Sequence, residues 1–187
     1  MNSESDPMLA SGLKILQSGA EIVVNICPKD ILIITLGSIF AGSTLGANCS
    51  PPAPVPDVEE LKLDDSWGLW CKLSQEHPEF VDLSPFCARI AESTNECFLV
   101  MLNGWEFFER FACLVHSLPS TVTSLMPLAT AQYLKRDEGD RPSTIPDNVQ
   151  NMALIVQFVG LPDDTVFSME YNVRGAQTAA YHLMGLV

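Results

Sequence analysis

Apolar residues recur at three- and four-residue steps through most of the chain, and this spacing is typical of amphipathic helices. The clearest run begins at Ser84-Pro85, where serine can cap a helix and proline fits its first turn. It continues to about Leu118 through Phe86, Ile90 and Met101. Weaker runs predict further helices over 9–24, 57–73, 119–133, 147–159, 163–173 and 176–184. No alternating run indicates a sheet, so the pattern predicts an all-α fold, a bundle of about five or six helices.

An uncharged stretch from Ile31 to Ala47 interrupts this pattern. Asp30 can cap a helix that starts there, and four prolines between 51 and 56 follow as a stiff extended linker. The chain is therefore predicted to have four parts. They are an N-terminal arm (1–30), an apolar helix (31–47), a proline-rich linker (48–56) and an acidic helical domain (57–187).

The apolar helix has three interpretations. A helix over 31–47 would be about 26 Å long, slightly shorter than the roughly 30 Å hydrocarbon core of a bilayer, so it is a candidate transmembrane helix. Ser38, Gly42 and Gly46 recur every four positions and would let a neighbouring helix approach closely. The same segment could instead lie buried between subunits of an assembly or in the core of a monomer. Each glycine costs an isolated helix about 1 kcal/mol, so every interpretation requires packing against something.

Composition limits the partners. Apolar residues make up 47% and charged residues 18% of the chain. The charged fraction is below the roughly 25% that is usual, which suggests burial beyond a monomer core. Ten basic residues face 23 acidic ones, for a net charge of -13. Nucleic-acid and anionic-lipid binding depend on clustered basic residues, so both are disfavoured for this chain alone. Other protein subunits, in a homo- or hetero-oligomer, and a membrane are the predicted partners.

Candidate chemistry is sparse. The six cysteines form no CxxC pair, and GxSxG, HExxH, GxxxxGK[ST] and GxGxxG are all absent. The three histidines and the adjacent acidic pairs are better explained as surface or helix-end residues. The sequence therefore predicts no catalytic residue, no cofactor and no metal site. Trp67, Trp70 and Trp105 are interpreted as core residues, with a partner-facing aromatic patch as the alternative.

Together these features predict a non-catalytic structural or accessory subunit of a larger, membrane-embedded assembly. The alternatives are a self-assembling viral coat or nucleocapsid-type protein and, third, an enzyme with a nonstandard site. The acidic N-terminus argues against secretion. The predicted location is the membrane of an intracellular compartment, or the cytoplasm as part of a large assembly. The predicted packing or interface residues are Ser38, Gly42, Gly46, Trp67, Trp70 and Trp105.

Overall fold

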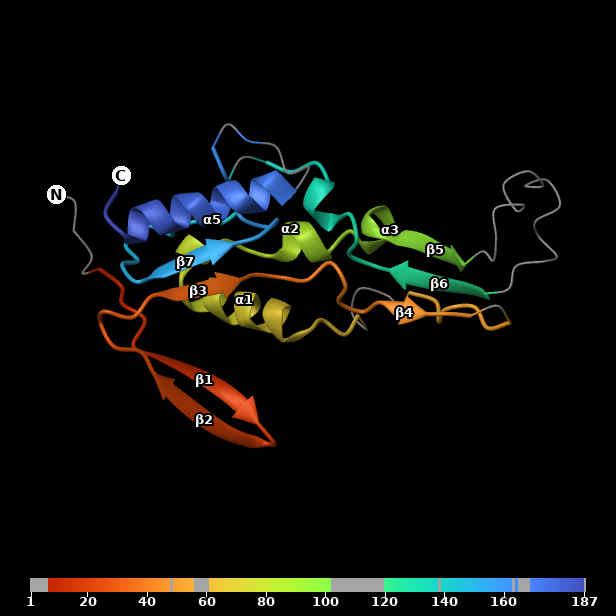
Figure 1. The fold of residues 1–187 in the computed structure, drawn as a ribbon, viewed down its shortest axis with the longest axis horizontal. Coiled ribbons are helices and arrows are strands. Elements are labelled where there is room, and N and C mark those ends of the chain that lie inside the picture. Colours follow the sequence, from red (N-terminus) through yellow and green to blue (C-terminus); the bar gives the residue numbers. More distant parts are fainter. Residues whose placement is uncertain are drawn as a thin grey trace. The chain divides into compact units, whose positions relative to one another are not determined.

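The computed structural model describes residues 7–47, 49–55, 61–101, 120–137, 139–162, 164 and 169–186. These residues form a mixed α/β fold with short helices and three small sheets (Figure 1). The chain divides into two compact units that are interleaved in sequence. Unit 1 comprises Met1–Gly37, Ser66–Leu83 and Lys135–Val187, and unit 2 comprises Ser38–Asp65 and Ser84–Leu134.

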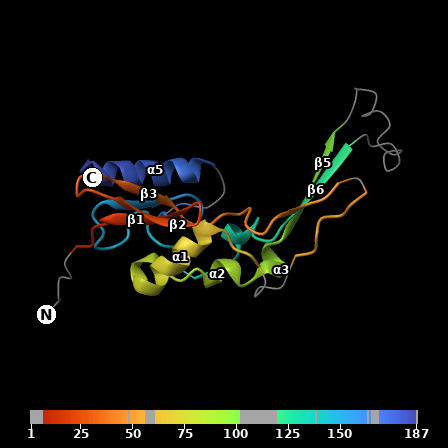
Figure 2. The ribbon, with the colours of Figure 1, turned by 90° about the horizontal axis from the view of Figure 1, so that it is seen from below.

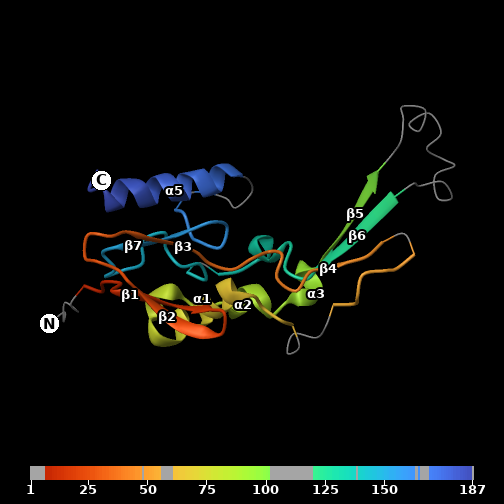
Figure 3. The same cartoon turned by 60° about the horizontal axis from the view of Figure 1, so that its bottom comes forward.

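Unit 1 is built on a pair of parallel strands. β3 (Leu32–Thr35) pairs with β7 (Met152–Ile155) in the register Leu32 to Met152 through Thr35 to Ile155. The helix α5 (Met169–Leu183) lies on one side of this pair, and α1 (Asp65–Glu76) lies on the other (Figure 3). A short 3-10 turn, η1 (Pro78–Phe80), follows α1. β7 is buried between the two helices, whereas Ile33 and Thr35 of β3 are exposed.

An aromatic cluster forms the core of unit 1. The Trp67 and Trp70 rings stack with their centroids 5.5 Å apart. Phe158 meets Trp67 edge to face at 5.0 Å, and all three side chains are fully buried. The Trp70 indole Nε1 donates a hydrogen bond to the Phe80 carbonyl at 2.8 Å, which satisfies its polar group inside the core.

A hairpin precedes β3 in the same unit. β1 (Gly12–Gln17) and β2 (Ala20–Asn25) are antiparallel and are joined by Ser18 and Gly19, which both have positive φ (52° and 82°). Two positive φ angles match the two-residue type I′ turn, which suits the twist of a hairpin. The predicted helix over 9–24 is therefore wrong.

Unit 2 contains an antiparallel sheet in the order β4 (Thr44–Leu45), β6 (Ser120–Met126), β5 (Asn95–Met101). Its shorter elements are α2 (Ser84–Cys87), α3 (Ile90–Ser93) and η3 (Ala131–Tyr133). The long strands β5 and β6 run side by side (Figure 2).

Buried Ser93 links the end of α3 to the chain that follows β6. Its hydroxyl donates to the Pro127 carbonyl at 2.6 Å, and its own carbonyl accepts from the Thr130 N–H at 3.1 Å.

The predicted all-α bundle is wrong, and the predicted apolar helix over 31–47 is wrong with it. β3 and β4 occupy that segment, and no described helix has the length and apolarity needed to cross a membrane. Strands of parallel sheets read as unbroken apolar runs, and Ile31-Leu-Ile-Ile is such a run, rich in β-branched residues. Apolar spacing alone does not distinguish such a run from a buried helix. The four-part division along the chain stays a prediction.

Candidate functional site

The helix α5 has a buried side and a polar side. Tyr171, Gly175 and Ala179 follow one another at four-residue steps and are buried. On a second face, at three- and four-residue steps, the helix carries Arg174, Gln177, Thr178, Tyr181 and His182. Residues of this polar side line two cavities.

The two cavities adjoin each other along α5. The larger, of about 400 Å³, lies between residues 143–149, the turn at 160–162, and Thr178 and His182 of α5. The smaller, of about 280 Å³, continues toward Asp164 and Arg174. Both are lined by Leu161, Pro162 and Thr178, so they form one two-lobed depression, hereafter the α5 groove.

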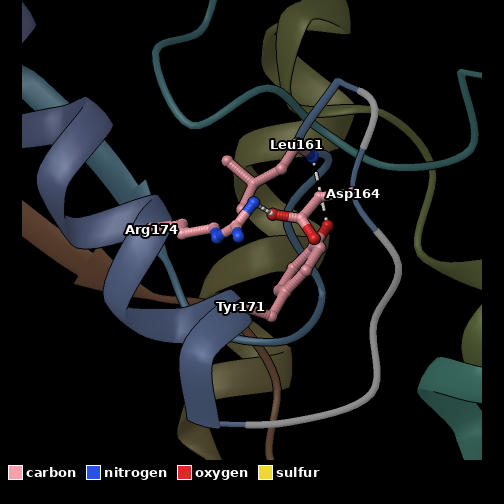
Figure 4. Close-up of polar contacts among 4 residues, drawn as sticks. All are labelled: Leu161, Asp164, Tyr171 and Arg174. Atoms are coloured by element: carbon pink, nitrogen blue, oxygen red, sulfur yellow. Dashed lines mark hydrogen bonds and ion pairs between the residues drawn. The ribbon is translucent and has the colours of Figure 1, made fainter.

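Tyr171 fixes the turn that separates the two lobes. Its hydroxyl donates to the Val159 carbonyl at 2.5 Å. It also accepts from the Leu161 N–H at 3.1 Å (Figure 4). Burial raises the pKa of Tyr171 above its ordinary value, which keeps the phenol protonated and able to donate. The turn at 159–161 is thus tied to the buried side of α5.

An ion pair closes the smaller lobe at one side. Arg174 Nη1 lies 3.0 Å from Asp164 Oδ2 (Figure 4). The arginine side chain is 65% exposed, so solvent screens the pair and its contribution to stability is small. Its effect is to hold the guanidinium beside the groove, where the donors that do not face Asp164 can meet a polar ligand.

A second arginine supports the chain that leads into the turn. Arg141 Nη1 donates to the Gln157 carbonyl at 2.5 Å. Desolvation by burial lowers the pKa of Arg141, but a guanidinium stays charged at neutral pH. A methyl group at Gly160 would lie 3.3 Å from the Arg141 Cβ, so the glycine permits this close packing.

The lining of the α5 groove suits hydrogen bonding more than bond-making chemistry. It combines hydroxyl and amide side chains, Asp147 and His182 with the apolar side chains of Ile145, Val149 and Leu161. Among the described residues, no group of three or more histidine, cysteine or acidic side chains could hold a metal ion. Thr144, at the larger lobe, is 2% exposed, and its hydroxyl has no hydrogen-bond partner among the residues that the structure describes.

The predicted interface residues are not brought together. Ser38, Gly42 and Gly46 belong to unit 2, where the chain is extended or turning, so they form no helical stripe. Trp67 and Trp70 lie in the core of unit 1, and Trp105 lies outside the described residues. An interface role for these residues stays a prediction.

Sequence reasoning missed the residues of the α5 groove. The available signal was the spacing of residues in α5, where the buried residues recur every four positions and the polar residues recur every three or four. The signal was obscured because two helices, over 163–173 and 176–184, are predicted where the single helix α5 lies.

Replacing Tyr171 by phenylalanine is expected to lower the free energy of unfolding by about 1–3 kcal/mol, because the Val159 carbonyl and Leu161 N–H lose their shared partner. The raised pKa adds a pH signature. The wild type should lose stability as the pH rises through the phenol pKa, and the variant should lose less. Urea unfolding at neutral and alkaline pH measures both effects. Tyr181→Phe, at a half-exposed position on the same helix, is the control and should change little.

The MCRA family model matches residues 1–121 and 112–181 of this chain. Among curated proteins, an oleate hydratase of Streptococcus pyogenes serotype M49 (strain NZ131) is 42% identical over 66 residues. That alignment covers 35% of this chain and 11% of the relative. A linoleate hydratase of Lactiplantibacillus plantarum is 31% identical over 70 residues, which are 37% of this chain and 12% of the relative. The aligned residues thus span about a tenth of the length of these relatives.

These matches overturn the predicted function. A non-catalytic subunit of a membrane assembly and a viral coat protein are both wrong, because the chain is related to enzymes that hydrate fatty acids. The expectation that the protein is not an enzyme is wrong for the same reason. The sequence carries none of the four catalytic or nucleotide-binding signatures named above, so its motifs do not reveal this relationship. With a family model matching nearly its whole length, the chain belongs to the MCRA family.

Proposed function

We propose that this protein takes part in the hydration of unsaturated fatty acids, the addition of water across a carbon–carbon double bond. The observation that carries the proposal is the 42% identity with an oleate hydratase within a family match that extends over most of the chain. The similarity to a linoleate hydratase supports the same substrate class. The name of each relative gives an unsaturated fatty acid as its substrate.

Fatty acid hydratases are FAD enzymes. The chain has no GxGxxG loop, and the described part of unit 1 supplies two parallel strands with one helix after the second. A dinucleotide site of the doubly wound type needs a glycine-rich turn between a strand and a helix. The described residues therefore do not fit a flavin site of this type by themselves.

The α5 groove is the part of the described chain best suited to polar recognition. Hydration requires an acid that protonates one carbon and a base that activates water for the other. The titratable side chains in the larger lobe are Asp147 and His182. Those in the smaller lobe are Asp164, Arg174 and Tyr181. The groove also has apolar lining residues, among them Ile145, Val149 and Leu161, so its lining combines polar groups with surface that an acyl chain could contact.

The direct test is to incubate the protein, with FAD added, with oleate or linoleate in water enriched in oxygen-18. The expected product is a hydroxy fatty acid that is heavier than the substrate by one water molecule and carries the oxygen-18. Mass spectrometry detects it. His182→Ala is expected to reduce the rate by about 10²-fold or more if the imidazole acts as the acid or base. His77→Ala is the matched control, because His77 directly precedes η1 and does not line the groove.

Two results would count against the proposal. Folded protein that yields no labelled product from either fatty acid would remove the activity from this chain. Equal rates for the two histidine variants would leave the activity but take the α5 groove out of the reaction.

A further inference from the structure

Three polar residues of α5 follow one another at four-residue steps along the α5 groove. Arg174 lines the smaller lobe, His182 lines the larger lobe, and Thr178 lines both. Residues four apart lie on the same face of a helix, one above the other. From Arg174 to His182 the helix advances about 12 Å, at a rise of about 1.5 Å per residue. A guanidinium and an imidazole therefore belong to one wall of the groove, at its two ends.

Arg174 has donors left for an anionic ligand. Asp164 Oδ2 accepts one hydrogen bond from Arg174 Nη1 at 3.0 Å. Among the residues that the structure describes, the other guanidinium nitrogens have no hydrogen-bond partner. An arginine offers five N–H donors in a planar fork, which matches the two oxygens of a carboxylate. Gln177 and Tyr181 line the same lobe and add neutral polar groups. The smaller lobe is thus suited to a carboxylate that Asp164 does not displace.

Apolar side chains connect the two ends of the groove. Leu161 and Pro162 line both lobes, and Ile145 and Val149 line the larger one. The larger lobe, of about 400 Å³, lies within the range of about 300–1,000 Å³ that is usual for small-molecule sites. An acyl chain that starts at the smaller lobe can therefore run over apolar surface into the larger one.

The larger lobe contains a buried hydroxyl without a partner. Thr144 lines this lobe and is 2% exposed, and its hydroxyl has no hydrogen-bond partner among the described residues. Buried polar groups are nearly always hydrogen-bonded, and a ligand or an ordered water serves where the protein does not. His182 lines the same lobe. The larger lobe therefore offers a position for water and an imidazole together, which are the groups that hydration requires.

The length of the groove matches the position of the double bond in two fatty acids. Oleate and linoleate are the substrates in the names of the relatives, and both have a double bond between carbons 9 and 10. With carbon–carbon bonds of about 1.5 Å, an extended chain advances about 1.3 Å per carbon, so this double bond lies about 10–12 Å from the carboxylate. The advance of α5 from Arg174 to His182 is the same within this range.

We infer that Arg174 binds the carboxylate of an unsaturated fatty acid and thereby places carbons 9 and 10 beside His182. Arg174 is then a specificity-determining residue, because the distance from the guanidinium selects the carbon that reaches the imidazole. The identity of the ligand rests on the proposed function. The orientation rests on the residues of the α5 groove, and binding experiments test it without any turnover.

The first test measures the affinity for decanoate by titration calorimetry, because ten carbons span the groove from Arg174 to His182. Arg174→Gln is expected to weaken decanoate binding by at least about tenfold, since it removes a charge-assisted hydrogen bond. Arg89→Gln is the matched control. It removes an arginine that also pairs with a carboxylate, Glu92 at 3.5 Å, but does not line the groove, and should change the affinity by less than about twofold. Decanol has the same chain without the carboxylate and should bind the wild type and Arg174→Gln equally.

The second test maps the orientation with decanoate that carries a diazirine at carbon 9. Irradiation releases dinitrogen and leaves a carbene that inserts into a nearby bond, and tandem mass spectrometry locates the adduct. The expected adducts lie on residues 143–149 or on His182. A diazirine at carbon 3 should instead label Gln177 or Tyr181. An excess of decanoate should suppress both labels.

Three results would overturn the inference. One is that folded wild-type protein binds decanoate no better than decanol, or does not bind it. Another is equal affinity in the two arginine variants. The third is a carbon-9 adduct in the smaller lobe, which would mean that the chain lies the other way round. A protein that binds decanoate as expected but forms no oxygen-18 product would refute the proposed activity and leave the role of Arg174 in place, so the two failures are distinguishable.

Discussion

Replacing Phe158 by alanine is expected to lower the free energy of unfolding by about 3–5 kcal/mol, the range for a fully buried phenylalanine. The centroid of the Phe158 ring lies 5.0 Å from that of Trp67 and 5.9 Å from that of Trp70. Removing the ring therefore removes a packing contact from each indole. Part of the loss comes from these aromatic contacts, at about 0.5–1.5 kcal/mol per pair. Urea unfolding followed by tryptophan fluorescence measures the change, because two of the chain's three tryptophans contact the ring.

Phe40→Ala supplies the matched control, because it deletes the same atoms from a side chain that is 67% exposed. Its effect should stay within about 0.5 kcal/mol. Equal losses for the two variants would mean that Phe158 does not belong to a packed core. A large loss for Phe158 alone would place the segment after β7 in the same cooperative unit as α1.

The sequence predicted helices best where caps and breakers agree with the apolar spacing. A helix was expected over 57–73, and α1 occupies Asp65–Glu76 with Trp67 and Trp70 inward. Ser84-Pro85 does begin a helix, but α2 ends at Cys87. The polar stretch 137–147 contains no helix or strand in its described residues, as expected. These signals are local, so they survive without knowledge of the tertiary fold.

The strands could not be predicted from spacing, since tertiary pairing determined them. β7 lies within the segment 147–159, where the apolar spacing predicts a helix. This segment is extended because it pairs with β3, more than a hundred residues earlier in the chain. Gly175 misled in the opposite direction. It lies between the helices predicted over 163–173 and 176–184, yet it is inside the single helix α5, where an added Cβ would make only an ordinary contact of 3.9 Å with Leu161.

The candidate site depends on the same long-range information. The α5 groove joins the turn after β7 to a polar helix face, and Tyr171 ties the two together by hydrogen bonds that no sequence pattern reveals. The sequence does contain enough information to predict on which side of α5 the groove lies. Four-residue steps of Tyr171, Gly175 and Ala179 identify the buried side, and the polar residues between them identify the other.

Gly37→Ala is expected to destabilise unit 1 by about 2–5 kcal/mol, from two sources that can be separated. Gly37 follows β3 with φ at +69°, a conformation that costs a residue with a side chain about 1–2 kcal/mol. An added Cβ would also lie 2.9 Å from two atoms of the Phe158 ring and 3.2 Å from Trp67. Overpacking of this kind costs about 1–3 kcal/mol. Gly139 has φ at +93° and nothing within 4 Å of an added Cβ, so Gly139→Ala reports the backbone cost alone.

A double-mutant cycle assigns the remainder to the aromatic cluster. In the Phe158→Ala background the ring that meets the new methyl group is gone, so Gly37→Ala should cost about 1–3 kcal/mol less than in the wild type. Gly139→Ala should cost the same in both backgrounds, because it contacts nothing there. If Gly37→Ala costs the same with and without Phe158, the Phe158 ring is not the reason that a glycine is required here. A reduced cost would show that Gly37 is required because β3 must turn directly beneath a filled aromatic core. That requirement differs from the close helix approach that the small residues of this segment suggested.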